Sequence, residues 1–317
     1  MNNLADEAFQ TAFGRHWDEE SADRLRAGVA RADRKGMRAG VFAKAGDSNL
    51  VGHNLLYGLG CRTPQWGDWQ WLEPTMCRYR ETELPPGEGP AVQVPDARQR
   101  EPGNSFTRVS AAGAFGIIAP HLYERSSKFR SDLGWKPDPR CRPWQSMLDF
   151  EICRTKPRWI LVNLGSNGAN YGLSPEHTAR QVARVIRAIR RRGPVPVVCT
   201  LPPALNHAEL TGRWDFAREA SDRIRQVVVR AGVPLIDQWK MLTDERLVDT
   251  GLVNHGLIEF DGPHFDGFHL ETVGGFRDPD ALEHAVDFRP EALRFGANLM
   301  NLVYLRTLQA LDSALAE

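Results

Sequence analysis

Apolar runs and helix-spaced apolar positions alternate through the second half of the chain. Residues 159–162 are continuously apolar, which is typical of a strand buried on both faces of a parallel sheet. Residues 174–192 place apolar side chains on one helical face, and Gly193 ends that pattern. The same pattern predicts strands at 195–200 and 233–237 and a helix at 214–231. This alternation predicts right-handed βαβ units, and therefore a parallel α/β sheet.

The remaining segments place this sheet within the whole chain. Apolar positions at helical spacing over residues 4–35 predict an N-terminal helical extension. Residues 37–45 are expected to form a strand that breaks at the turn Gly46-Asp47-Ser48-Asn49. A long amphipathic helix is expected over residues 290–315.

Composition excludes several classes of protein. The 317 residues are 42 % hydrophobic and 25 % charged, as expected of a soluble globular chain and not of a disordered or fibrous one. The 40 basic and 40 acidic residues give a net charge of zero, which argues against a nucleic-acid-binding protein. No apolar run is long enough to span a bilayer.

The N-terminus and the cysteines bear on the compartment. The first residues, MNNLADEAFQ, lack a basic region followed by an apolar one, so we expect a cytoplasmic protein. Secretion is the alternative if a signal peptide was removed ahead of residue 1. The five cysteines form no C-x-x-C pair, which predicts free thiols in a reducing compartment and no metal site.

Polar residues that could take part in a reaction follow the ends of the predicted strands. Ser48, in the turn after the first strand, can present a hydroxyl beside its own amide, although Asp and Ser are also ordinary turn residues. A serine nucleophile needs a base and a group that orients the base, and Asp261-Gly262-Pro263-His264 and Asp266-Gly267-Phe268-His269 both offer them. Asn167, after the strand at 159–162, can donate from its side-chain amide to an oxyanion.

The order G-D-S, G-x-N and D-x-x-H resembles the SGNH (GDSL-type) serine hydrolase superfamily. Ser48 matches the nucleophile, followed by Asn49 where many members have Leu. In the segment 112–116, Gly116 best matches the glycine whose amide completes the oxyanion hole, with Gly113 as the alternative. Asn167 matches the asparagine of G-x-N, but the next residue is Gly168 where the family usually has Asp.

The last motif has two candidates. Asp266 and His269 are followed by Leu270 and Gly274, as in the family's H-L-x-x-x-G run, and are preferred for that match. Asp261 and His264 lack this continuation and form the alternative acid/base pair; otherwise they would be a structural loop or a substrate contact. Residues 288–296 also resemble the segment before the terminal helix of some uncharacterised bacterial members.

The resemblance implies a three-layer α/β/α, flavodoxin-like fold with a parallel sheet of about five strands. Because the motifs extend from Ser48 to His269, dividing the chain between them would split the site. We therefore expect a helical extension at 1–36 and one domain at 37–317, with irregular insertions near 62–104, 131–146 and 243–290.

The implied activity is carboxylic ester hydrolysis of the esterase, acetylesterase or lipase type. Ser48, His269 and Asp266 would form the triad, and Ser48, Gly116 and Asn167 the oxyanion hole, with no cofactor or metal. The substrate would be a small-molecule, lipid or acylated-carbohydrate ester. A catalytically inactive binding protein of the same fold is the alternative function. Metal-assisted phosphoester hydrolysis fits less well, because no cluster of acidic metal ligands is present.

Three tryptophans follow the nucleophile segment at alternating or near-alternating positions: Trp66, Trp69 and Trp71. Aromatic side chains there could form a wall that stacks on sugar or acyl groups of a substrate. The more economical interpretation is that they pack an insertion against the body of the protein.

Overall fold

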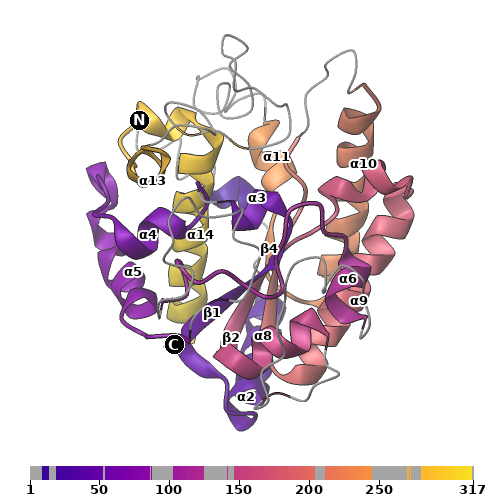
Figure 1. Ribbon diagram of the computed structural model, residues 1–317, viewed down its shortest axis with the longest axis horizontal. Coiled ribbons are helices and arrows are strands. Elements are labelled where there is room, and N and C mark those ends of the chain that lie inside the picture. The colour runs from indigo at the N-terminus through magenta and orange to yellow at the C-terminus, as the bar shows by residue number, and fades with distance from the viewer. Residues whose placement is uncertain are drawn as a thin grey trace.

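A parallel sheet forms the centre of the computed structural model, which describes residues 9–13, 19–52, 54–85, 87, 103–124, 141, 146–203, 211–244, 270, 272 and 280–315 (Figure 1). Four strands are found among these residues: β1 (Arg38–Gly46), β2 (Pro157–Asn163), β3 (Val195–Cys199) and β4 (Leu235–Ile236). They lie side by side in the order β1-β2-β3-β4, and every neighbouring pair is parallel. The ends of β1 and β2 are in register, with Gly46 opposite Asn163.

Helices precede, follow and connect these strands. In the first half of the chain they are α2 (Glu19–Arg34), α3 (Ser48–Val51), α4 (Tyr57–Cys61), η2 (Gly67–Leu72), α5 (Glu73–Arg80) and α6 (Ala119–Tyr123). In the second half they are α8 (Met147–Thr155), η5 (Ser166–Tyr171), α9 (Pro175–Arg192), α10 (Thr211–Ala231), α11 (Gln238–Leu242), α13 (Ala281–His284), η6 (Ala292–Arg294) and α14 (Gly296–Ser313).

The sheet is buried on both faces, which gives the three layers. Along β2, Trp159 and Leu161 pack into one core with α2, α4, α5 and α14, whereas Ile160 and Val162 pack into the other with α6, α8, α9 and α10. This alternation follows from the two-residue repeat of a strand. Figure 1 shows α4, α5 and α14 on one side of the sheet and α6, α9 and α10 on the other.

The expected α/β/α fold is confirmed, with a smaller sheet than expected. The described residues contain four strands and not five. Beyond β1, a single parallel bridge between Gly46 and Gly113 continues the pairing at that edge. The segment near Gly113 turns after that bridge and forms no ladder, which explains why it is not a fifth strand.

One of the irregular insertions contains regular structure, and the N-terminal extension contains a helix that packs on the sheet. Residues 67–80, inside the insertion expected near 62–104, form η2 and α5. Helix α2, in the expected N-terminal extension, buries Leu25 and Val29 in the same core as α14. The N-terminal helix is therefore part of the layer that covers one face of the sheet.

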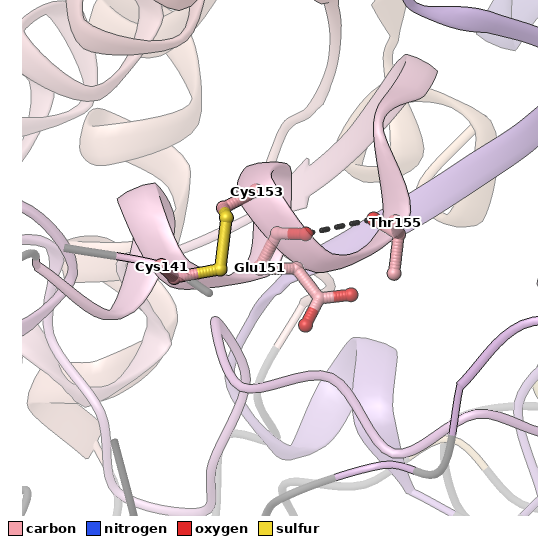
Figure 2. Close-up of a disulfide and its surroundings, with 4 residues drawn as sticks. All are labelled: Cys141, Glu151, Cys153 and Thr155. Carbon is pink, nitrogen blue, oxygen red and sulfur yellow. Dashed lines mark hydrogen bonds between the residues drawn. A yellow bond between two sulfur atoms is a disulfide. The ribbon is translucent and has the colours of Figure 1, made fainter. Parts of the chain in front are cut away.

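Two cysteines form a disulfide, which corrects the expectation of five free thiols. Cys141 is bonded to Cys153 on α8, and the bridge lies beside Glu151 on the same helix (Figure 2). The hydroxyl of Thr155 donates to the Glu151 carbonyl oxygen at 2.8 Å (Figure 2). Cysteine spacing carries no signal for this pairing, because the disulfide joins positions brought together only by the fold.

A buried ion pair lies next to this helix. Arg108 donates to Glu151 at 2.5 Å and 2.6 Å, and both side chains are 2 % exposed. Glu151 also accepts from the Ala111 amide at 2.9 Å. Lys44 on β1 is fully buried nearby and donates to the Phe106 carbonyl oxygen at 2.8 Å. These groups hold the segment around 106–111 against β1 and α8.

Within the residues that the structure describes, no helix has the length and hydropathy needed to span a membrane.

Candidate active site

Ser48 lies directly after the carboxyl end of β1, at the edge of the sheet where parallel-sheet proteins place their sites. The preceding Gly46 is required there: a Cβ atom would lie 2.4 Å from the Asn163 carbonyl oxygen on β2. The Asp47 amide donates to that same oxygen at 3.1 Å. The chain then turns into α3, which begins at Ser48 and leaves its side chain half-buried.

The buried carboxylate of Asp47 connects two of the sequence motifs. One oxygen accepts from the Asn49 amide at 3.1 Å and caps α3. The other accepts from Nδ2 of Asn167 at 3.3 Å. Because a carboxylate oxygen only accepts, this contact assigns the orientation of the Asn167 amide. Oδ1 of Asn167 in turn accepts from Nδ2 of Asn170 at 3.4 Å. The nucleophile turn and the G-x-N turn are thus held together.

The segment that carries Gly116 follows the edge of β1. Gly46 donates to the Ala112 carbonyl oxygen at 3.1 Å, and the Ala114 amide donates to the Gly46 carbonyl oxygen at 3.1 Å. The Gly113 amide is occupied by the Ser110 carbonyl oxygen at 3.2 Å. Gly116, with φ of 72°, turns the chain toward Ser48 and lines the same pocket. Of the two candidate glycines, Gly116 is among the described residues that line that pocket, and Gly113 is not.

The amides of Ser48 and Gly116 share a further property. Neither donates a hydrogen bond within the described part of the chain. Buried or half-buried backbone donors are usually paired, so two unpaired donors at one pocket indicate a place for an acceptor. Such a pair of backbone donors is what an oxyanion hole requires.

A pocket of about 280 Å³ is centred on these residues. Its polar side is formed by the motif residues and their neighbours: Ser48, Asn49, Gly116, Ser166, Asn167 and Asn170. Its other side is mainly apolar and comes from residues after β3 and from α10: Leu201, Pro202, Phe216 and Ala217, joined by Phe115. A half-buried cation, Arg213, completes this wall.

A layer of buried polar groups lies below the pocket. Asn163, at the end of β2, donates to Gln238 at 3.0 Å and to the Asn49 carbonyl oxygen at 3.5 Å. The hydroxyl of Tyr304 on α14 contacts Sγ of Cys199 at 3.5 Å, and burial raises the pKa of that phenol well above its usual value. Tyr304 therefore remains protonated and serves as support for the strand ends.

Tyr171, at the end of η5, restrains the segment that contains Gly116. Its hydroxyl donates to the Gly116 carbonyl oxygen at 3.2 Å, and its ring packs edge-on against His121 at 6.1 Å between centroids. His121 is partly buried, which lowers its pKa. Both side chains help to fix the turn that presents the Gly116 amide.

Gly168, where the family usually has Asp, has a steric reason in this fold. A Cβ atom there would lie 2.7 Å from Oγ1 of Thr178 and 2.8 Å from the ring of Phe216. The space that a larger residue would need is therefore filled by α9 and α10. Asp47 and Asn170 hold Asn167 in place from either end without help from position 168.

The acid/base candidates Asp261, His264, Asp266 and His269 lie outside the described residues. Leu270, which follows His269 directly, is described and is 1 % exposed. Its carbonyl oxygen accepts from Nδ2 of Asn54 at 2.6 Å. Asn54 follows Ser48 by six positions, so the chain returns at Leu270 to the neighbourhood of the nucleophile segment.

The three tryptophans are not among the described residues that line the pocket. Trp66 and Trp69 are 7 % and 5 % exposed and belong to the core on the α14 side of the sheet. Trp66 packs against Phe288 at 5.8 Å between ring centroids, and Trp71, half-exposed, packs beside Trp69 at 6.2 Å. This placement favours the packing interpretation over a substrate wall.

No group of three or more His, Cys, Asp or Glu side chains that could hold a metal is found in the described ranges. The donors that surround Ser48 are amides and hydroxyls, which suit recognition of an oxygen that acquires negative charge.

Comparison with known families now adds to this geometry. The sequence model of the GDSL-like Lipase/Acylhydrolase family matches residues 103–274, a little over half of the chain. The chain belongs to this family. None of the curated proteins matches the chain.

Family membership indicates a hydrolase of the lipase or acylhydrolase type and leaves the substrate open. The matched span includes Gly116 and Asn167 and also both D-x-x-H pairs. It begins after Ser48, so the association of Ser48 with the family site depends on the fold, through Asp47 and the bridge at Gly46.

Three contributors to the site could not be found from the sequence. Asp47 was visible only as part of a motif, and its carboxylate contact with Asn167 needs the fold. Tyr171 and Arg213 carry no sequence signal, because each reaches the site through the placement of a helix.

Proposed function

We propose that the protein is a serine hydrolase that cleaves carboxylic esters through an acyl-enzyme. Ser48 is the nucleophile, His269 the base and Asp266 the group that orients the base. The observation that carries the proposal is that Ser48, Gly116 and Asn167 line one pocket, and that the amides of Ser48 and Gly116 have no acceptor within the described part of the chain.

In the first half of the reaction, Oγ of Ser48 forms a bond to the ester carbonyl carbon as its proton passes to His269. The carbonyl oxygen becomes an oxyanion and accepts from the amides of Ser48 and Gly116 and from Asn167. The contacts that Nδ2 of Asn167 makes in the structure, to Asp47 and the Ile117 carbonyl oxygen, are both 3.3 Å, so one can be exchanged for a shorter bond to the oxyanion.

Collapse of this intermediate breaks the bond between the carbonyl carbon and the alcohol oxygen, and the alcohol leaves with the proton held by His269. In the second half, water attacks the acyl group while His269 accepts its proton. The acid is released, and Ser48 regains its hydroxyl proton. No electrons are exchanged, and no co-reactant besides water is consumed.

The choice of His269 over His264 is supported by the position of Leu270. Leu270, the residue after His269 in the sequence, accepts from Asn54, which follows Ser48 by six positions. The family continuation H-L-x-x-x-G points to the same histidine.

Hydrolysis of para-nitrophenyl acetate by four variants tests the proposal. Ser48→Ala and His269→Ala should each lower kcat/KM by about a thousandfold or more, as loss of a triad member does. Ser313→Ala, which removes an exposed hydroxyl on α14, should retain the activity of the unaltered protein. His264→Ala should retain most of it.

Two outcomes would change the assignment. Full activity in Ser48→Ala would remove Ser48 as the nucleophile. Loss of activity in His264→Ala with retention in His269→Ala would transfer the role of base to the first pair. A complete lack of ester hydrolysis by the folded protein would instead favour the inactive binding protein.

A further inference from the structure

One face of α10 contributes to the pocket that Ser48 lines. Arg213, Phe216 and Ala217 all line the pocket, and residues three and four positions apart share one face of a helix. Of the described side chains that line the pocket, Arg213 alone carries a charge. The position of this arginine is therefore set by the same helix face that shapes the apolar wall.

The surroundings of Arg213 favour contact with an anion. The side chain is half-buried, and its desolvation lowers its pKa while leaving it cationic at neutral pH. Phe216, Leu201 and Pro202 line the same pocket with apolar side chains, and a charge–charge interaction is stronger in apolar surroundings than in water. A guanidinium has five N–H donors, so it can keep a protein partner and also donate to a ligand.

The other cations of α10 differ from Arg213. Arg218 pairs with Asp215 at 3.0 Å, its neighbour along the helix. Arg225 pairs with Asp222 at 2.6 Å and with the buried Asp237 at 2.5 Å. Neither arginine is among the described residues that line the pocket. Arg213 is the arginine of α10 that lines the pocket.

We propose that Arg213 is a specificity residue that binds an anionic group of the substrate, so that the enzyme prefers short esters carrying a carboxylate near the scissile bond. This inference rests on the proposed esterase function of Ser48. A volume of about 280 Å³ is close to the lower end of the range for ligand pockets and favours a short substrate. The guanidinium fork matches the two oxygens of a carboxylate.

Matched ester pairs test the preference and show on which side of the ester the charge lies. On the acyl side, para-nitrophenyl hemisuccinate is compared with para-nitrophenyl butyrate. On the alcohol side, para-acetoxybenzoate is compared with phenyl acetate. For at least one pair, kcat/KM should favour the charged ester in the unaltered protein.

Replacement of the cation should remove that preference. Arg213→Gln should lower kcat/KM for the favoured anionic ester by about ten- to a hundredfold, as expected for a charge-assisted hydrogen bond, and change the neutral ester little. Arg213→Lys should keep part of the preference because it keeps the charge. Arg223→Gln removes an exposed cation from the same helix and controls for net charge; it should leave the preference unchanged.

Direct binding separates this inference from the chemistry. Calorimetric titration of Ser48→Ala protein with the charged and the neutral ester of the favoured pair measures recognition without hydrolysis. The charged ester should bind more tightly than the neutral one. In the double variant, which carries both Ser48→Ala and Arg213→Gln, the two esters should bind with equal affinity.

The inference would be overturned if Arg213→Gln kept the same preference for the charged ester as the unaltered protein. It would also be overturned if Arg223→Gln lost that preference to the same extent as Arg213→Gln. Selective binding that persists without any Ser48-dependent hydrolysis would contradict the proposed function and leave the anion site standing.

Discussion

Lys44 offers a quantitative test of how the buried charges around the Arg108–Glu151 pair affect the stability of the protein. It is fully buried on β1, and burial lowers its pKa to about 8, with Glu151 opposing and Arg108 reinforcing that shift. Lys44 and Arg108 are both cations and Glu151 is an anion, so these three buried side chains carry one excess positive charge. We predict that Lys44→Met, which keeps the length of the side chain without the charge, stabilises the protein at pH 7.

The magnitude follows from the pKa. A fall from 10.5 to about 8 corresponds to a cost of about 3 kcal/mol for keeping the charged form in the folded state. Lys44→Met removes this cost, but it also removes the 2.8 Å hydrogen bond to the Phe106 carbonyl oxygen, worth about 1–2 kcal/mol. The net expectation is a gain in unfolding free energy of about 1–2 kcal/mol.

The pH dependence has a definite sign. Below pH 8, Lys44 is protonated in both the folded and the unfolded states, and its full cost is present. As the pH rises from 8 toward 10.5, the folded state loses the proton first, so the unfolded state binds more protons and stability increases. From pH 7 to about pH 9.5, the Lys44 contribution to stability should rise by about 2 kcal/mol.

Denaturant unfolding of the unaltered protein and Lys44→Met at pH 7 and at about pH 9.5 measures this effect. Other groups titrate in this range, so the quantity compared is the difference in unfolding free energy between the two proteins. The advantage of Lys44→Met should become smaller or change sign at the higher pH. Lys240→Met, at an exposed position on α11, is the control and should show no such change. A Lys44→Met difference that stays constant across the range would refute the reasoning.

The site and the disulfide give three further predictions. Asp47→Asn should lower kcat on a neutral ester by about tenfold, because an amide would face the Asn167 amide where a carboxylate now accepts; circular dichroism should be unchanged. Gly168→Asp should lower the unfolding free energy by about 2 kcal/mol or more through overpacking, and an unchanged melting temperature would contradict this. Replacing Cys141 and Cys153 together with Ser should cost about 3 kcal/mol, measured as a fall in the denaturant midpoint, and an unshifted midpoint would argue against a stabilising bridge.

The sheet was predictable from the sequence because its strands are buried on both faces. A short, continuous apolar run such as residues 159–162 indicates a buried strand when helical periodicity follows it, and β2 is found there. Helix α9 likewise ends at Gly193, as its pattern predicts. What was not predictable was the short pairing at Gly113, because one bridge leaves no periodic signal.

The site was predictable only in part. Short motifs point to Ser48, Gly116 and Asn167, and the pocket includes all three. The contribution of α10 was not visible, since Arg213 stands just before the segment with a clear helical pattern. The same limit applies to Cys141, whose partner is determined by the packing of α8.

The proposed role of Ser48 as the nucleophile is tested most directly by covalent labelling. The protein is treated with a fluorophosphonate, digested and mapped by mass spectrometry, with Ser48→Ala as the matched control. A single adduct is predicted on the peptide that contains Ser48, and none on the variant. Ester hydrolysis without an adduct on Ser48, or an adduct that persists in Ser48→Ala, would contradict this role.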